Sequence, residues 1–118
     1  MTRDRIYADY LHDLLDALRK SRQFVAGMRF EQFSKDDKTV YAVIRALEVV
    51  GEAAKQTPHD VQQRHQRVPW QEMAGMRDKL IHHYFGVDLK VVWKPVKEDV
   101  PSLIPTIRDV IAEEEALG

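Results

Sequence analysis

The sequence contains no cysteine among its 118 residues, which excludes disulfides, thiolate zinc sites and a cysteine nucleophile. It also has no apolar run near the ~18–20 residues of a membrane span, and its N-terminal segment carries too many charges for a signal peptide. The formal net charge is only −1. These features predict a single domain over residues 1–118, a cytoplasmic location and no membrane partner.

Charge is distributed unevenly along the chain. Residues 64–97 hold seven Lys or Arg against three acids, whereas residues 98–118 hold one arginine and six acids. The central excess could attract a polyanion, while the acidic end argues against indiscriminate nucleic-acid binding. A solvated charged surface is the alternative interpretation.

Apolar residues recur every three or four positions along most of the chain, which predicts helices. No strand-like alternation, internal repeat or low-complexity segment is present. The predicted helices cover roughly residues 6–25, 36–57, 69–85, 88–98 and 102–118. Residues 58–67 are expected to form a polar turn or a short polar helix, because the stretch Gln62–Arg67 has no apolar face. The predicted fold is therefore all-α, an antiparallel bundle of four or five helices.

Residues that start or interrupt helices refine this prediction. Ser34 or Asp36 is expected to cap the second helix, and Ser102 the last. Pro105 would then lie in a first turn, where no amide hydrogen bond is lost, and Pro95 is expected to kink or shorten the helix over 88–98.

Arg77 interrupts the apolar face of the helix predicted over 69–85. At ~100° per residue it lies within about 60° of Trp70 and Leu80. A buried guanidinium needs a partner because it cannot lose its proton. Glu52 is a candidate partner, since it follows Gly51, which would let another helix approach closely. The structural interpretation is a buried Arg77–Glu52 pair or a guanidinium that reaches solvent, and the functional one is an external anion.

Cationic, acid–base and hydroxyl groups are concentrated in the same predicted helix, at Arg77, Asp78, Lys79, His82, His83 and Tyr84. Without a metal, such a set suits the cleavage of RNA. An imidazole with a pKa near ~6.5 can take a proton from a 2′-hydroxyl, and a guanidinium can neutralise charge on the five-coordinate phosphate. The histidines show no metal-ligand spacing such as H-x-x-x-H or H-E-x-x-H, so neither a metal nor another cofactor is predicted.

Arg77 and His82 do not share a helical face, because five residues turn an ideal helix by roughly 140°. The two groups can still converge if the long arginine side chain reaches around the helix, if the helix unwinds before Gly86, or if a second chain provides one of them. Asp78, four residues before His82, could orient its ring and raise its basicity, and His83 likewise follows Lys79. A surface feature of a helix end is the alternative interpretation of the two histidines.

The segment from Trp70 to Trp93 (WQEMAGMRDKLIHHYFGVDLKVVW) resembles the signature of HepT-type toxins in the HEPN superfamily. The motif of that family is R-x(4)-H-x-Y, which Arg77, His82 and Tyr84 match letter for letter. The similarity continues in VVGEAAK at Val49–Lys55 and in DVPSL before the last predicted helix, so it covers nearly the whole chain.

The resemblance implies a helical homodimer with a shared cleft and metal-independent endoribonuclease activity, in which Arg77 is the electrostatic stabiliser and His82 the general acid/base. It also implies a partner, a nucleotidyltransferase antitoxin of the MntA type that transfers AMP to Tyr84. The added phosphate would repel RNA from the cleft. The alternative is a non-catalytic HEPN module that binds the nucleotidyltransferase or a nucleotide. The residues expected to support the site are Asp78, Lys79, His83 and Glu52.

Overall fold

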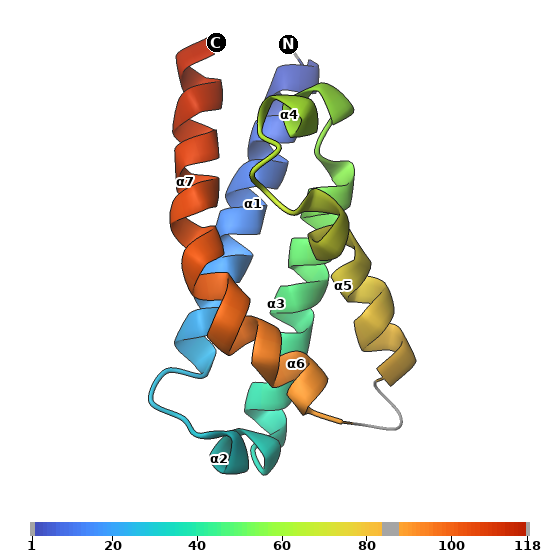
Figure 1. Ribbon diagram of the computed structural model, residues 1–118, viewed down its shortest axis with the longest axis vertical. Coiled ribbons are helices and arrows are strands. Elements are labelled where there is room, and N and C mark those ends of the chain that lie inside the picture. The colour runs from blue at the N-terminus through green and yellow to red at the C-terminus, as the bar shows by residue number, and fades with distance from the viewer. Residues whose placement is uncertain (1, 84–87, 118) are drawn as a thin grey trace.

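The computed structural model describes residues 2–83 and 88–117, and the side chains of residues 7–80 and 88–117. Regular structure in these ranges is helical throughout, and successive long helices run in opposite directions (Figure 1). This arrangement confirms the predicted all-α antiparallel bundle. In chain order the elements are α1 (Thr2–Phe24), α2 (Phe30–Ser34), α3 (Asp37–Gln56), α4 (His59–Arg64), α5 (Trp70–His83), α6 (Lys90–Lys94), a π-helical turn η1 (Pro95–Asp99) and α7 (Val100–Leu117).

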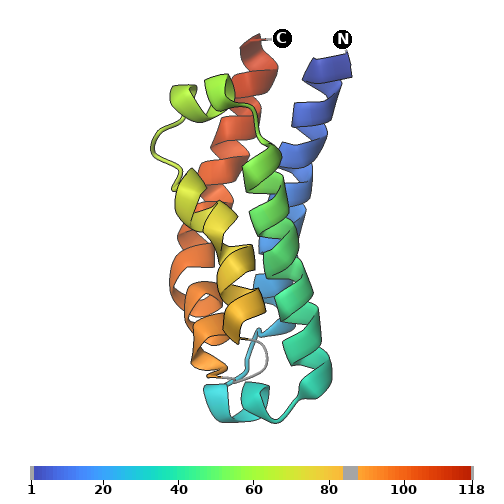
Figure 2. The ribbon, with the colours of Figure 1, turned by 90° about the vertical axis from the view of Figure 1, so that its right-hand side faces the viewer.

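The two ends of the bundle are built differently. The start of α1, the end of α7 and the short helix α4 lie at one end, whereas α2 and the start of α6 lie at the other (Figures 1 and 2). The C-terminal end of α5 points toward the α2–α6 end. The end of α5, which includes the backbone of His82, therefore lies far from the chain termini (Figure 1).

Apolar side chains form two packed clusters along the bundle. In the cluster nearer the termini, α1, α3, α5 and α7 contribute Leu14, Val50, Met73 and Ile107, all essentially inaccessible to water. The second cluster joins α2, α3, α5, α6 and η1 through buried residues that include Phe33, Leu47, Leu80, Val92 and Val96.

None of the helices within 2–83 and 88–117 is long and apolar enough to cross a bilayer.

The predicted cap of α3 is confirmed at Asp36. Its Oδ1 accepts a hydrogen bond from the backbone N–H of Thr39 at 3.1 Å, which satisfies one of the free amides in the first turn and lowers the pKa of the carboxyl. The preceding turn contains Gly27 with φ of +76°, a conformation that favours glycine, just after α1 ends.

The predicted start of the last helix at Ser102 is wrong. The helical elements α6, η1 and α7 follow one another without a break, and in η1 the N–H of Val100 bonds to the carbonyl of Pro95, five residues back. Because Pro101 has no N–H to donate, the wider π-helical turn changes the hydrogen-bonding pattern of the backbone at this point without interrupting the helical segment. Ser102 lies inside α7, where its hydroxyl donates to the carbonyl of Asp99 at 3.0 Å, and Pro105 also lies inside α7.

Candidate functional site

The candidate site begins where α3 and α5 touch at Gly51. A Cβ atom at this position would lie 3.1 Å from Cβ of Arg77 and 3.2 Å from the carbonyl oxygen of Met73. Such distances leave no room for a side chain, so glycine allows the two backbones to approach closely. The close approach predicted from the sequence is confirmed.

This close crossing sets the direction of the Arg77 side chain, which passes out of the bundle. The side chain is 47% exposed, whereas Trp70 and Leu80 of the same face are buried. Of the two structural interpretations, the structure therefore shows the guanidinium that reaches solvent and not the buried pair. Its Nε lies 4.0 Å from Oε1 of Glu52, the partner expected from the sequence. A pair at this distance and exposure holds the guanidinium weakly, which leaves it able to bind an external anion.

A second arginine reaches the same carboxylate. Nη1 of Arg45, on α3, lies 3.8 Å from Oε1 of Glu52, and the Arg45 side chain is 65% exposed. Sequence reasoning missed Arg45 because it stands 32 positions before Arg77. The spacing of seven residues between Arg45 and Glu52, two turns on one helix face, is the signal that could have found it.

The other predicted site residues follow Arg77 along α5. Asp78 and Lys79 are exposed. His82 and His83 are the last two residues of α5, and their side chains lie outside the described part of the structure, as does all of Tyr84. The structure thus brings together Arg77 and Glu52 and places the backbone of both histidines at the end of the same helix.

Near the termini, a buried ion cluster joins α4 and α7. Glu114 accepts hydrogen bonds from Nε and Nη2 of Arg64 at 3.0 and 2.7 Å and lies 2.6 Å from Nε2 of His65. The hydrogen bonds from Arg64 lower the pKa of Glu114 to about 2, with a smaller contribution from His65, although burial opposes the shift. The short polar helix predicted within residues 58–67 is present as α4. Gln62–Arg67 was predicted to lack an apolar face, but its His65 is buried, as is the neighbouring Val61.

These contacts also redistribute the charge seen in the sequence. Arg64 is paired with Glu114, and Arg67 with Glu113, so the acidic end of the chain neutralises part of the central basic excess. Arg77 is not among the residues paired in this way. Of the seven basic residues between 64 and 97, five lie outside these two pairs, and Arg77 is one of them.

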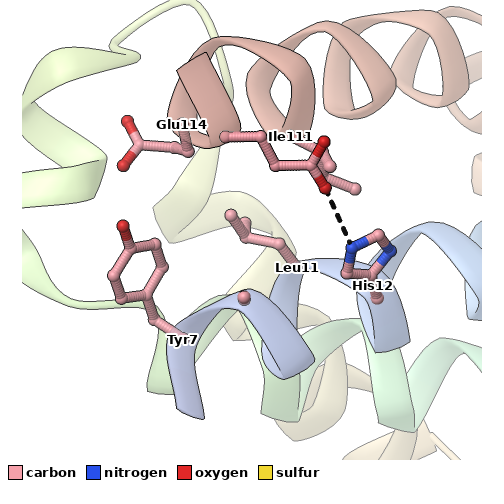
Figure 3. Close-up of a pocket in the computed structure, with 7 residues that line it drawn as sticks. Tyr7, Leu11, His12, Ile111 and Glu114 are labelled. Atoms are coloured by element: carbon pink, nitrogen blue, oxygen red, sulfur yellow. Dashed lines mark ion pairs between the residues drawn. The ribbon is translucent and has the colours of Figure 1, made fainter. Parts of the chain in front are cut away.

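Two hollows in the described surface lie beside other groups. A pocket of about 170 Å³ between α1 and α7 is lined by Tyr7, Leu11, Ile111 and the ion pair of His12 with Glu115, whose Nε2 and Oε1 are 3.5 Å apart (Figure 3). A groove of about 410 Å³ between α5 and the η1–α7 segment contains Met73 and Met76, and its carboxylates are Glu72 and Asp99. Each hollow combines acidic and basic groups, with His12 in the pocket and Arg67 in the groove, and neither is lined by Arg77.

The structure defines an all-α helical bundle with an exposed arginine on α5, and comparison with known proteins gives its family. The family model described as "Ribonuclease HepT-like" matches residues 14–110. The chain is 54% identical over 99 residues to "Probable ribonuclease HepT" of Thermococcus cleftensis, which covers 84% of this chain and 90% of the relative. It therefore belongs to the HepT-like ribonuclease family.

Other relatives agree with this assignment. A "Putative RNase" of Methanocaldococcus jannaschii is 44% identical over 90% of this chain and 88% of its own length. A "Putative RNase" of Caldanaerobacter subterraneus subsp. tengcongensis is 39% identical over 90% of this chain and 95% of its own length. No solved structure matches the chain significantly.

Proposed function

We propose that this chain is a metal-independent endoribonuclease. The observation that carries the proposal is the position of Arg77, which is half exposed, weakly paired with Glu52 and five residues before His82 on α5. Membership of the HepT-like family, with relatives named as ribonucleases, supports the same activity.

The reaction follows from the chemistry of these two side chains. His82 takes the proton of a 2′-hydroxyl, the 2′-oxygen attacks the adjacent phosphorus, and the bond from phosphorus to the 5′-oxygen breaks. The proton is returned to the departing 5′-oxygen, so the products are a 2′,3′-cyclic phosphate and a 5′-hydroxyl. The guanidinium of Arg77 stabilises the additional negative charge on the five-coordinate phosphate.

A homodimer completes the proposed site. His82 follows Arg77 by five residues, and an ideal helix turns by roughly 140° over that spacing, so one helix is not expected to direct both groups to the same phosphate. In a homodimer with a shared cleft, Arg77 of one subunit and His82 of the other can act on the same phosphate.

The purified chain is expected to cut single-stranded RNA in the presence of EDTA. Because the 2′-oxygen is the nucleophile, products should end in 2′,3′-cyclic phosphates, as judged by mass spectrometry. An oligonucleotide of the same sequence with 2′-deoxy residues is the control and should stay intact. Cleavage of both substrates, or dependence on added metal, contradicts the proposed mechanism.

We further propose that the chain is the toxin of a toxin–antitoxin pair, silenced by an MntA-type nucleotidyltransferase that transfers AMP to Tyr84. The support is the position of Tyr84 two residues after His82 in the family motif. A phosphate at this position would repel RNA from the catalytic groups and occupy their space.

Co-expression with an MntA-type nucleotidyltransferase is expected to add the mass of AMP to Tyr84. Intact mass and peptide mapping test this modification, and the Tyr84→Phe variant, which lacks the acceptor hydroxyl, is the control. We expect the modified chain to lose RNA cleavage and the variant to remain toxic in the presence of the partner. Modification of another residue, or full activity of the AMP-bearing chain, counts against this regulation.

A further inference from the structure

The outer face of α3 beside Arg77 carries groups that the proposed mechanism does not use. Tyr41 and Arg45 stand one helical turn apart on α3, about 6 Å along its axis. Their side chains are strongly exposed, with Tyr41 at 60% and Arg45 at 65%. An aromatic ring and a guanidinium at this spacing can bind a base and a neighbouring phosphate.

Glu52 connects this face to Arg77. Because Arg45 and Arg77 both approach Oε1 of Glu52, at 3.8 and 4.0 Å, the contacting nitrogens of the two guanidiniums lie within about 8 Å of each other. Glu52 alone cannot neutralise both guanidiniums, and Glu48, one turn away on α3, balances the remaining charge. An RNA phosphate at Arg77 would still place an adjoining part of the chain near Arg45.

The charge around these residues limits the ligand to a short one. Glu48 also lies on this side of α3, one turn from both Arg45 and Glu52, so the surface is mixed in sign. A mixed surface is poorly suited to a long stretch of nucleic-acid backbone, whereas one stacked base and one phosphate need only Tyr41 and Arg45.

We infer that Tyr41 and Arg45 form a subsite for the nucleotide next to the cleaved bond, with the base stacked on Tyr41 and its phosphate bound by Arg45. The inference rests on the proposed ribonuclease activity and adds to it the binding of a neighbouring nucleotide. Glu52 is the carboxylate that both Arg45 and Arg77 approach.

The test measures binding of fluorescent single-stranded RNA to chains that carry the His82→Ala substitution, so that no substrate is cut. We expect Tyr41→Ala to weaken binding roughly tenfold and Tyr41→Phe to bind normally, because stacking needs the ring and not the hydroxyl. Arg45→Ala should lower the dependence of log affinity on log salt by about 0.7, the value for one single-strand phosphate contact. In the cleaving chain, both alanine variants should raise KM several-fold with kcat within twofold.

Matched control variants distinguish the loss of a specific subsite from a general effect of removing an exposed aromatic ring or a positive charge. Phe24→Ala removes another partly exposed aromatic ring and Arg108→Ala another exposed arginine, and both should bind RNA as the parent does. An RNA with an abasic residue at the stacked position should bind Tyr41→Ala and the parent equally. A Tyr41→Ala effect that persists on every abasic RNA, or parent-like binding by both α3 variants, overturns the inference.

The outcomes also distinguish this inference from the proposed function. If RNA is cut normally but both α3 variants bind as the parent does, the subsite is wrong and the ribonuclease proposal stands. If the chain cuts no RNA but binding depends on Tyr41 and Arg45 as described, the ribonuclease proposal is wrong and the RNA-binding surface stands.

Discussion

Replacing Arg77 with alanine is expected to lower the rate of RNA cleavage at least 100-fold, with little change in folding. The rate falls because the five-coordinate phosphate loses its permanently charged partner, and such groups contribute about 100- to 1000-fold in kcat. Stability should change by less than about 1 kcal/mol, since the pair with Glu52 is long and half exposed. Initial rates on a defined RNA and thermal melting by circular dichroism measure the two effects.

Two further variants test the role of the guanidinium. Arg77→Lys retains the positive charge without the planar fork, and we expect an intermediate rate. Arg108→Ala removes an exposed arginine from α7 and should cut RNA as the parent does. Parent-like cleavage by Arg77→Ala and by His82→Ala would contradict the catalytic proposal and favour the alternative, a HEPN module that binds without cleaving.

Mixing inactive chains tests whether the site is shared between two subunits. His82→Ala alone should lose about 100- to 10,000-fold in rate, the range for a general acid or base. When this variant is unfolded and refolded together with Arg77→Ala, mixed dimers contain one intact Arg77 and one intact His82. Partial recovery of cleavage is expected if the two chains line one cleft. Rates no higher than those of the separate variants contradict the shared cleft but leave the ribonuclease proposal intact.

The sequence predicted those features of the site that local pattern determines. Gly51 on an apolar stripe correctly indicated a close helix crossing, and Glu52 was correctly named as the partner of Arg77. The direction of the Arg77 side chain could not be predicted from periodicity alone. Periodicity places a residue on a face but does not show that the neighbouring backbone already fills the space there.

The features that were missed depend on residues far apart in the chain or on alternatives of similar energy. Arg45 joins the site only because α3 and α5 cross at Gly51, and His65 is buried because Glu114, 49 residues away, accepts a hydrogen bond from it. Prolines near the start of α7 have no backbone N–H to donate. The chain can accommodate them either with a helix cap at Ser102 or with a π-helical turn, and the sequence pattern does not discriminate between the two.

Replacing Glu114 with glutamine is expected to destabilise the fold by about 2–3 kcal/mol at pH 7, a decrease of roughly 10 °C in Tm. The Glu114 side chain is only 4% exposed and is the shared acceptor for Arg64 and His65, so the variant loses a buried charge that two groups stabilise. The matched control is Glu113→Gln, whose partner Arg67 is exposed, and it should cost less than about 1 kcal/mol. Equal effects of the two substitutions would contradict the assignment.

The same comparison should depend on pH in a direction fixed by the lowered pKa of Glu114. Its pKa is about 2 in the folded chain against an ordinary value of 4.5, so the carboxylate stabilises the fold above pH 4.5 and loses this effect as pH falls toward 2. At pH 3 the difference in unfolding free energy between the parent and Glu114→Gln should be less than half its value at pH 7. Urea titrations at the two pH values measure it. A difference that does not change with pH would mean that Glu114 stabilises the bundle by packing, because only an ionised carboxylate gains from Arg64 in a way that protonation removes.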